Sequence, residues 1–233
     1  DKLPFCTNFL HMLFSVPSEP YIVPKDHDKL LNQLWILYGD HEQNVAATTV
    51  QLVGSTKANL FASISAGISA LWGSREGGQS VAAVELLENI LKSGKDYKTY
   101  LSDATIRGEL AKANFLGHEA YKVKSPRAIV AREIFRDFFK THHTPLVDLA
   151  FEVDEYISNE SYFKDKNLYP NLEFYSGILF NTIGIPKNMF TLMQAIGKLP
   201  GWLAHWRELR IRSNFKKARP RQIYIGNMNK THT

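Results

Sequence analysis

Apolar residues recur every three or four positions along most of the chain, which is the period of an amphipathic helix. Leu30, Leu34 and Leu37 share one such face, and Asp26 or Asp28 can cap its start. The same period predicts further helices over residues 44–53, 58–72, 79–93, 126–141, 145–158, 171–184, 187–197 and 200–210. The pattern therefore predicts an all-α protein of about nine helices with short connections.

A few segments stand apart from this pattern. Residues 97–113 have a weaker period and are predicted to form one short helix, and residues 222–225 (QIYI) are strand-like. Residues 58–72 are rich in Ala, Ser and Gly. Because small residues let helices approach closely, we predict that this helix is central and buried. Trp202 and Trp206, one helical turn apart, are interpreted as core anchors.

Composition narrows the class of protein. Of the 233 residues, 44% are hydrophobic and 22% are charged, which argues against a disordered chain. No apolar run approaches the roughly 18 residues of a membrane span. Cys6 is the only cysteine, so neither an internal disulfide nor a cysteine zinc cluster is expected. The chain starts Asp-Lys-Leu, without a Met or a signal sequence, and we expect a cytoplasmic protein or an excised fragment of one.

The formal net charge of +5 is unevenly distributed. Residues 207–221 contain seven Arg and Lys residues against one acid, Glu208. This balance suits anionic metabolites, phosphate-bearing cofactors or nucleic acid, and its simplest interpretation is a solvated basic surface. Because the stretch has few aromatic residues, we rank nucleic-acid binding low.

Six short clusters combine Gly, His, Arg and acidic residues in a way that periodicity does not explain. They are residues 40–44 (DHEQN), 71–78 (LWGSREGG), 116–118 with 125–127 (LGH and SPR), 171–177 (NLEFYSG), 201–206 (GWLAHW) and 218–224 (ARPRQIY). In this order and spacing they resemble the citrate synthase family, both its bacterial type and its 2-methylcitrate synthase relatives. The resemblance runs from about Phe5 to Gly226, and it matches only the C-terminal half of a family chain.

The resemblance implies an all-α fold with a large and a small domain, a dimer, and an active site in the cleft between domains. We expect residues 1–78 to form large-domain helices, 79–185 a small CoA-binding domain, and 186–233 a C-terminal large-domain segment and arm. The family condenses acetyl-CoA or another acyl-CoA with oxaloacetate and hydrolyses the thioester. The expected partners are oxaloacetate, coenzyme A as co-substrate, and a second copy or the missing N-terminal half. No covalently bound cofactor, metal, nucleic acid or membrane is expected.

Four positions match residues that bind substrate in the family. The resemblance implies that His41 helps to bind oxaloacetate and that His118 hydrogen-bonds its carbonyl oxygen and makes it electrophilic. Arg127 matches an arginine that binds a substrate carboxylate through both arms of its fork. Arg219 matches one that reaches the active site of the partner subunit. The alternatives are a helix-end histidine for His41 and surface ion pairs for the arginines.

Three positions depart from the family. Glu76 stands where the family has a histidine that donates a hydrogen bond to the thioester oxygen, and an ionised carboxylate can only accept. Glu173 stands at the catalytic aspartate, the base that takes the methyl proton of acetyl-CoA, and it reaches one methylene further. Lys198 replaces a second carboxylate-binding arginine and keeps the charge without the planar fork. We therefore predict an impaired or altered acyltransferase.

One arrangement could restore the chemistry. If Glu76 and Glu173 faced each other in a dry cleft, both could not ionise, and one would hold a proton. A protonated Glu76 could then donate to the enolate oxygen while Glu173 acts as the base.

Two further hypotheses stay open. The chain could be a non-catalytic dicarboxylate- or CoA-binding or assembly protein, or one half of a split enzyme. Exposed apolar helix faces would favour the split enzyme. His142 and His143 look like a metal pair, but no third ligand is in register with them, so we interpret them as an exposed helix end.

Overall fold

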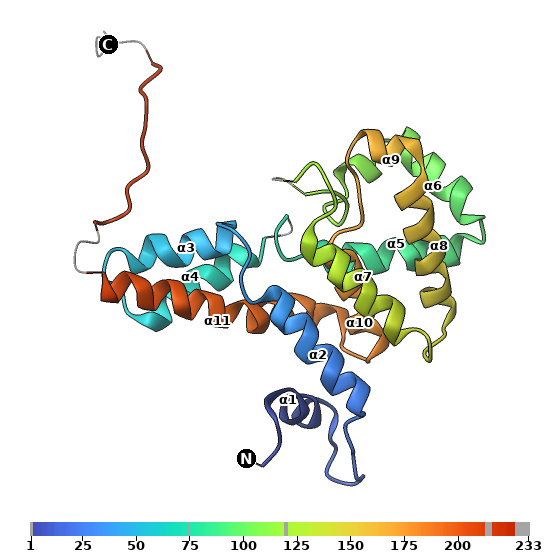
Figure 1. Cartoon of the computed structure of the whole chain (residues 1–233), viewed down its shortest axis with the longest axis horizontal. Coiled ribbons are helices and arrows are strands. Elements are labelled where there is room, and N and C mark those ends of the chain that lie inside the picture. The colour runs from blue at the N-terminus through green and yellow to red at the C-terminus, as the bar shows by residue number, and fades with distance from the viewer. Residues whose placement is uncertain (1, 74, 119–120, 213–215, 227–233) are drawn as a thin grey trace, which may run out of the picture.

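The computed structural model describes residues 2–73, 75–118, 121–212 and 216–226 of the chain, and these confirm the all-α prediction (Figure 1). The helices are α1 Phe5–Phe14, α2 Lys25–Tyr38, α3 Val45–Gly54, α4 Leu60–Leu71, α5 Gln79–Ser93, α6 Tyr97–Ile106, α7 Pro126–Phe138, α8 Pro145–Asn159, α9 Ser161–Asp165, α10 Leu172–Thr182 and α11 Phe190–Ile211. Two 3-10 turns, η1 Leu110–Lys112 and η2 Lys187–Met189, complete the order. Within these ranges the only β-type pairs are two isolated bridges.

Most helix starts follow local chemistry that the sequence contains. Thr144 caps α8, its Oγ1 accepting the N–H of Val147 at 3.3 Å, and Pro145 takes the first helical position. Pro126 likewise begins α7. The predicted cap of α2 is wrong, because that helix begins at Lys25 after Pro24, and Asp26 and Asp28 lie within its first turn.

Several boundaries differ from the prediction. The two helices predicted over 187–197 and 200–210 are one helix, α11, which continues through Pro200. Its first half is held against α2, where Trp35 Nε1 donates to the carbonyl of Met193 at 2.9 Å, so tertiary packing outweighs the proline. Residues 222–225 are exposed and extended without strand pairing, since no other extended segment of the described chain pairs with them. The pattern did not predict α1 or α9.

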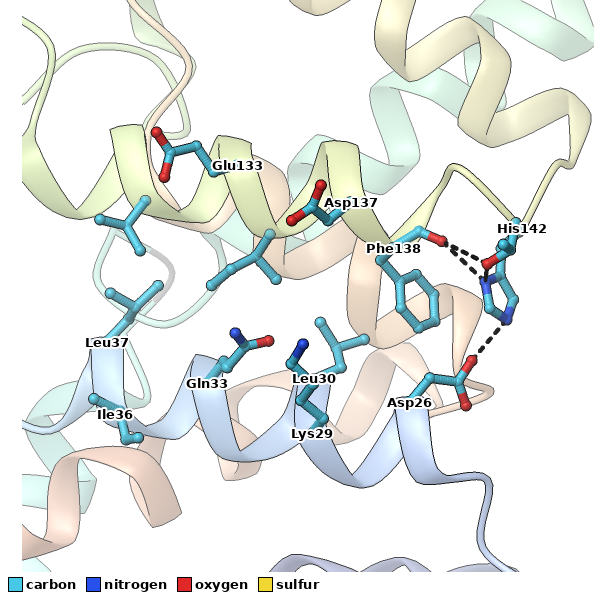
Figure 2. Close-up of a pocket in the computed structure, with 13 residues that line it drawn as sticks. Asp26, Lys29, Leu30, Gln33, Ile36, Leu37, Glu133, Asp137, Phe138 and His142 are labelled. Atoms are coloured by element: carbon cyan, nitrogen blue, oxygen red, sulfur yellow. Dashed lines mark hydrogen bonds and ion pairs between the residues drawn. The ribbon is translucent and has the colours of Figure 1, made fainter.

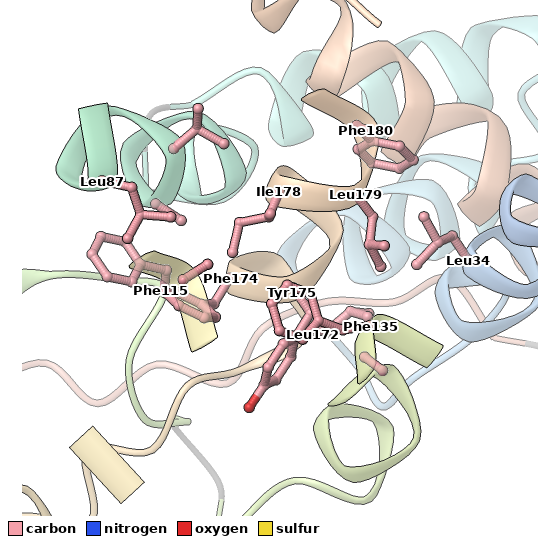
Figure 3. Close-up of a cluster of buried hydrophobic side chains, with 14 of the residues drawn as sticks. Leu34, Leu87, Phe115, Phe135, Leu172, Phe174, Tyr175, Ile178, Leu179 and Phe180 are labelled. Atoms are coloured by element: carbon pink, nitrogen blue, oxygen red, sulfur yellow. The ribbon is translucent and has the colours of Figure 1, made fainter. Parts of the chain in front are cut away.

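The larger core surrounds α10 (Figure 3). Nearly every side chain of this helix is buried, against α5 on one side and α7 on another. Gly177 permits the close approach to α5, because a Cβ there would lie 2.3 Å from the carbonyl oxygen of Ser80. A buried carboxylate, Asp154 of α8, ties this core together through Arg132 Nε at 2.6 Å and the Tyr175 hydroxyl at 2.7 Å. These contacts hold the start of α10, whose first turn carries Glu173, in a fixed position.

A smaller core joins α3, α4 and α11. Trp202 is 2% exposed there, which confirms it as a core anchor, while Trp206 is half-buried and donates to the carbonyl of Ala58. The prediction that α4 is buried is wrong for this chain. Only its small-residue face packs on α3 and α11, whereas Phe61 and the following Trp72 are each 81% exposed. No helix in the described ranges is both long and apolar enough to cross a membrane.

Candidate substrate site

The structure brings six of the seven predicted site residues together from six places in the chain. They lie after α2 (His41), in the turn before α5 (Glu76), in the loop before α7 (His118), at the start of α7 (Arg127), at the start of α10 (Glu173) and within α11 (Lys198). Arg219 lies apart, in the exposed segment 216–226 that extends away from the helices in Figure 1. The backbone N–H of its neighbour Ala218 donates to Ser55, which follows the C-terminal end of α3. His41 precedes the other end of α3, and this helix is about 15 Å long.

A tight turn between α2 and α3 presents His41. Glu42 has a left-handed backbone with φ 58°, uncommon for a residue with a side chain. Asn44 closes the turn, its side-chain amide donating to the His41 carbonyl at 3.3 Å and its oxygen accepting from Ala47 at the start of α3. Such a strained residue costs on the order of 1 kcal/mol or more and persists where the surroundings hold it. The turn directs the His41 ring against that of His118, with ring centres 5.4 Å apart.

The loop that carries His118 is tied to the start of α10. Gly117 has φ +78°, and its N–H donates to the Tyr169 carbonyl at 2.7 Å. Asn171 donates to the carbonyls of Asn114 and Gly117, and its oxygen accepts the N–H of Glu173. One side chain thus sets both the His118 loop and the N-terminus of the helix that carries Glu173.

A backbone hydrogen bond orients the His118 ring. The backbone N–H of Tyr121 donates to Nδ1 of His118 at 3.3 Å, so that nitrogen is an acceptor. With Nδ1 accepting, a neutral imidazole carries its proton on Nε2. In that tautomer Nε2 can donate to a carbonyl oxygen. The Tyr121 ring, 4.4 Å away between ring centres, holds the imidazole in place.

His41 and Arg127 each present a buried nitrogen that no other described group satisfies. The Nε of Arg127 and the Nε2 of His41 are buried without a hydrogen-bond partner in the described chain. A second arm of Arg127 donates to the Leu37 carbonyl at 3.4 Å, and the nearest carboxylate oxygen to His41 Nε2 is that of Glu42, at 3.7 Å. Burial, and then the charge of Arg127, lower the pKa of His41 below its ordinary value. The imidazole is therefore neutral at pH 7.

Lys198 is a buried cation, 8% exposed, among the altered residues. Burial lowers the pKa of its ammonium, and the nearby Arg127 acts in the same direction. Glu173 and Glu76 oppose this shift, so both carboxylates interact favourably with Lys198. The Nζ also lies 5.9 Å from the centre of the Tyr38 ring.

Hydrogen bonds within its turn and from α11 hold the backbone around Glu76. Its N–H donates to the Gly73 carbonyl at 2.9 Å. The next carbonyl, that of Gly77, accepts from Thr191 Oγ1 at 3.1 Å and from Gln194 Nε2 at 3.5 Å, both on α11. The backbone of this turn is thus held by the helix that also carries Lys198. The predicted dyad is modified as a result, because a lysine ammonium lies within range of both carboxylates.

Sequence reasoning missed two tyrosines that belong to the site. Tyr38 at the end of α2 hydrogen-bonds Ser176 at 2.6 Å, and burial followed by the charge of Glu173 raises its pKa. Tyr121 packs on His118 and is hydrogen-bonded with Glu42. Neither stands in a recognisable motif, and only the fold brings them to the site.

His41, Glu42 and His118 present three atoms of metal-ligating type within 4.8 Å of one another. The surrounding charge disfavours a cation there. Arg127 and Lys198 both act on His41 as positive charges, and Glu42 acts on it as a negative one. The described arrangement combines two cationic side chains, buried nitrogens without a partner among the described residues, the His118 imidazole and flanking carboxylates.

Comparison with known proteins gives consistent matches to one family. Residues 1–221 match the family model for the citrate synthase C-terminal domain. Citrate synthase 1 of Mycobacterium tuberculosis is 41% identical over 228 residues, covering 97% of this chain and 53% of that protein. The chain thus spans about half the length of the curated relatives it matches.

Solved structures agree with this match. The citrate synthase of Thermotoga maritima superposes with a TM-score of 0.80 at 29% identity, covering 99% of this chain and 60% of that one. A citrate synthase of Thermoplasma acidophilum, in ternary complex with carboxymethyl coenzyme A and oxaloacetate, gives a TM-score of 0.82 at 27% identity. It covers 98% of this chain and 58% of that chain.

Proposed function

We propose, from the premise that this chain belongs to the citrate synthase family, that its pocket binds oxaloacetate for condensation with an acyl-CoA. Acetyl-CoA is the proposed acyl donor, and citrate and CoA are the products. We further propose that turnover is impaired, because the groups that would move protons are substituted. A bound carboxymethyl coenzyme A and oxaloacetate in the Thermoplasma acidophilum relative support this choice of ligands.

The observation that carries the proposal is the pair of buried nitrogens on His41 and Arg127 that have no partner among the described residues. A buried polar group without a partner costs about 1–3 kcal/mol. A substrate carboxylate between these side chains would satisfy both donors and would be held by a charge-assisted hydrogen bond from the guanidinium. Lys198 supplies a second positive charge for the other carboxylate of the dianion.

His118 would activate the ketone of oxaloacetate. Its accepting Nδ1 leaves the proton on Nε2, the atom that would donate to the carbonyl oxygen. Donation there stabilises the negative charge that develops when a carbon nucleophile attacks. His118 thus retains its electrophilic role in the proposal.

The residues proposed to act on acetyl-CoA, which we call the acyl side of the site, lack a hydrogen-bond donor for the enolate. Glu173 would take the methyl proton of acetyl-CoA, and its position in the first turn of α10 is fixed by the Asn171 cap. Glu76 has no proton to donate when ionised, and Lys198 lies within electrostatic range of its carboxylate. The enolate oxygen would therefore meet a negative charge, and we expect slow thioester cleavage.

The test is release of CoA thiol from acetyl-CoA by the complete protein, with and without oxaloacetate. The proposal predicts slow release that requires oxaloacetate and that is lost in Arg127→Leu. Release that is independent of oxaloacetate, or unaffected by Arg127→Leu, would contradict it.

A second candidate is a non-catalytic dicarboxylate- or CoA-binding module. The favourable contacts of Lys198 with both Glu76 and Glu173 support it, because they compensate the altered charges without restoring a proton donor. Saturable oxaloacetate binding with no CoA release between pH 5 and 9 would favour this candidate.

We also propose that the chain works with additional protein. The exposed Phe61 and Trp72 on and beside α4 leave an apolar surface that a second copy or another segment would cover. In that assembly residues 79–185 would bind CoA, residues 1–78 and 186–233 would belong to the large domain, and Arg219 would reach the pocket of a partner subunit. Mass measurement of the native protein tests this, and a monomer would contradict it.

A further inference from the structure

A groove of about 430 Å³ lies between α2 and α7, outside the substrate site (Figure 2). At one end, residues from the first turn of α2 meet the segment that follows α7. Asp26, His27 and His142 each present an atom of metal-ligating type there, and these atoms lie within 4.8 Å of one another. His142 thus meets two further potential ligands from more than a hundred positions away, and His143 is not one of the group.

The contacts of His142 suit a positive charge at one particular place. Its Nδ1 lies 3.0 Å from the Phe138 carbonyl oxygen and 3.0 Å from the Thr141 hydroxyl oxygen. The carbonyl oxygen can only accept, so a proton on Nδ1 satisfies that contact. Its Nε2 lies 3.1 Å from Oδ2 of Asp26. In the tautomer with the proton on Nδ1, Nε2 presents a lone pair to the carboxylate, and a cation bound between these two atoms would remove the repulsion.

The orientation of the ring is the one that a metal ligand needs. A ligating histidine usually donates its other ring N–H to a carbonyl or carboxylate, which fixes the tautomer. Phe138 supplies that carbonyl, and its ring stacks on the His142 imidazole at 4.2 Å with an angle of 4°. The side chain is therefore held with Nε2 directed toward the first turn of α2, as Figure 2 shows.

The position of His27 favours a bound metal ion over a simple ion pair between His142 and Asp26. An ion pair of His142 and Asp26 accounts for two groups and leaves the third without a role. The His27 ring lies 6.2 Å from the His142 ring between centres, and its buried Nδ1 has no hydrogen-bond partner among the described residues. A metal ion would take a nitrogen of this second imidazole as a ligand.

We propose that Asp26, His27 and His142 form a binding site for a divalent transition metal, with Zn²⁺ as the preferred ion. Two imidazole nitrogens and one carboxylate form a donor set typical of Zn²⁺, and hard ions such as Mg²⁺ prefer oxygen ligands. Bonds of about 2.0–2.2 Å require the ligands to approach more closely than 4.8 Å. Asp26 and His142 are both partly exposed and can rotate to do so. The remaining coordination position would open toward the groove and take water.

The charge of the groove supports a cation, in contrast to the substrate site. Glu133 and Asp137 line it together with Asp26, and Lys29 is the basic residue among its lining. Asp137 is paired with Lys140, which reduces its contribution. The carboxylates still outnumber the nearby ammonium groups, so the local potential favours a divalent ion.

A metal at this site would join the start of α2 to the end of α7. Because the ligands come together only in the folded chain, binding would stabilise the native state. At a hundredfold excess over Kd, we expect the thermal midpoint to rise by about 5–10 °C.

The test is titration of the metal-stripped chain with Zn²⁺ against a chromophoric chelator, combined with thermal unfolding. The proposal predicts one Zn²⁺ per chain, at least a hundredfold weaker binding in His142→Ala and in His27→Gln, and loss of the thermal shift in both. His143→Ala is the matched control, because His143 is adjacent but pairs with Asp148. It should bind like the unmodified chain.

A second arm separates this site from the substrate pocket. His41→Gln should leave Zn²⁺ binding unchanged, and Co²⁺ should give the visible absorption of a four-coordinate ion in the unmodified chain and not in His142→Ala. Zn²⁺ binding that survives His142→Ala, that is lost in His41→Gln, or that is absent altogether would overturn the proposal. Absence would leave the direct contact of His142 with Asp26 as the explanation of the geometry.

Discussion

The two sides of the substrate site differ in what has been kept. On the proposed carboxylate-binding side, His41, His118 and Arg127 are the residue types that the resemblance implies, and buried nitrogens of His41 and Arg127 have no partner among the described residues. On the proposed acyl side, Glu76 and Glu173 stand where the resemblance implies a histidine and an aspartate, and both lie within electrostatic range of a buried lysine. The comparison teaches that binding and proton transfer depend on separate groups, so one can be lost while the other remains.

On the acyl side, the charges of the three altered residues compensate one another. A buried cation is strongly unfavourable without a partner, and Glu173 and Glu76 supply compensating charge for Lys198. Changing Glu76 alone would leave that lysine with one fewer counter-charge. This coupling explains why the substitutions form a set.

The largest expected effect tests the acyl side. Replacing Glu76 with His and Glu173 with Asp in the complete protein restores a hydrogen-bond donor for the enolate and the shorter base. An oxyanion donor contributes about 10²–10³ in rate, so oxaloacetate-dependent CoA release should rise by that order. Glu76→Ala is the control, because it removes the negative charge without adding a donor. Equal rates in the double variant and the control would break the comparison.

The next effect tests the binding side. Arg127→Leu removes the guanidinium and leaves His41 as the remaining donor of the pair. Losing a charged, buried partner costs about 2–5 kcal/mol, so the Kd for oxaloacetate should rise by about a hundredfold or more. Arg127→Lys, which keeps the charge but not the fork, should show an intermediate loss. Calorimetric titration measures both, and unchanged affinity in Arg127→Leu would show that the pocket lies elsewhere.

A smaller effect is expected at Lys198, which contributes to both the carboxylate-binding side and the acyl side of the proposed site. Lys198→Met removes the ammonium while keeping a similar length, so the dianion loses one positive charge and meets Glu76 and Glu173 without their cation. We expect oxaloacetate affinity to fall on the order of tenfold. A double variant with Glu76→Gln should recover part of this loss. If the two changes were simply additive, the proposed coupling would be absent.

The smallest effect is a pH dependence of stability. Burial lowers the pKa of His41, so the unfolded chain binds the proton more readily than the folded chain. Stability from this group is complete above the ordinary histidine pKa of about 6.5 and is lost as the pH falls toward the lower folded value. Urea unfolding at pH 8 and pH 5.5 should therefore show a smaller pH effect in His41→Asn than in the unmodified chain. An identical difference in both would contradict the assignment.

Much of the fold could be predicted from local signals. Thr144 with Pro145, and Pro126, marked helix starts correctly, because capping depends on neighbouring residues alone. The continuation of α11 through Pro200 could not be predicted, since it depends on packing against α2. Nor could the exposure of α4, because the apolar pattern does not say whether a covering surface is present in the same chain.

The site shows the same division. The resemblance identified six residues that the fold does bring together, but it could not supply their surroundings. The orientation of His118 depends on the N–H of Tyr121, and the charges around Lys198 come from four separate regions of the chain. The ligand-like grouping of His142 with Asp26 and His27 joins segments that are distant in sequence. Each of these depends on tertiary contacts that no local pattern encodes.

Calorimetric titration of the complete protein with oxaloacetate and, separately, with pyruvate tests the central claim most directly. Pyruvate keeps the ketone and one carboxylate and lacks the second carboxylate. A pocket with Arg127 and Lys198 as two cationic anchors should bind oxaloacetate saturably and at least about tenfold more tightly than pyruvate. Equal affinity for the two acids, or no saturable binding of oxaloacetate, would contradict the account.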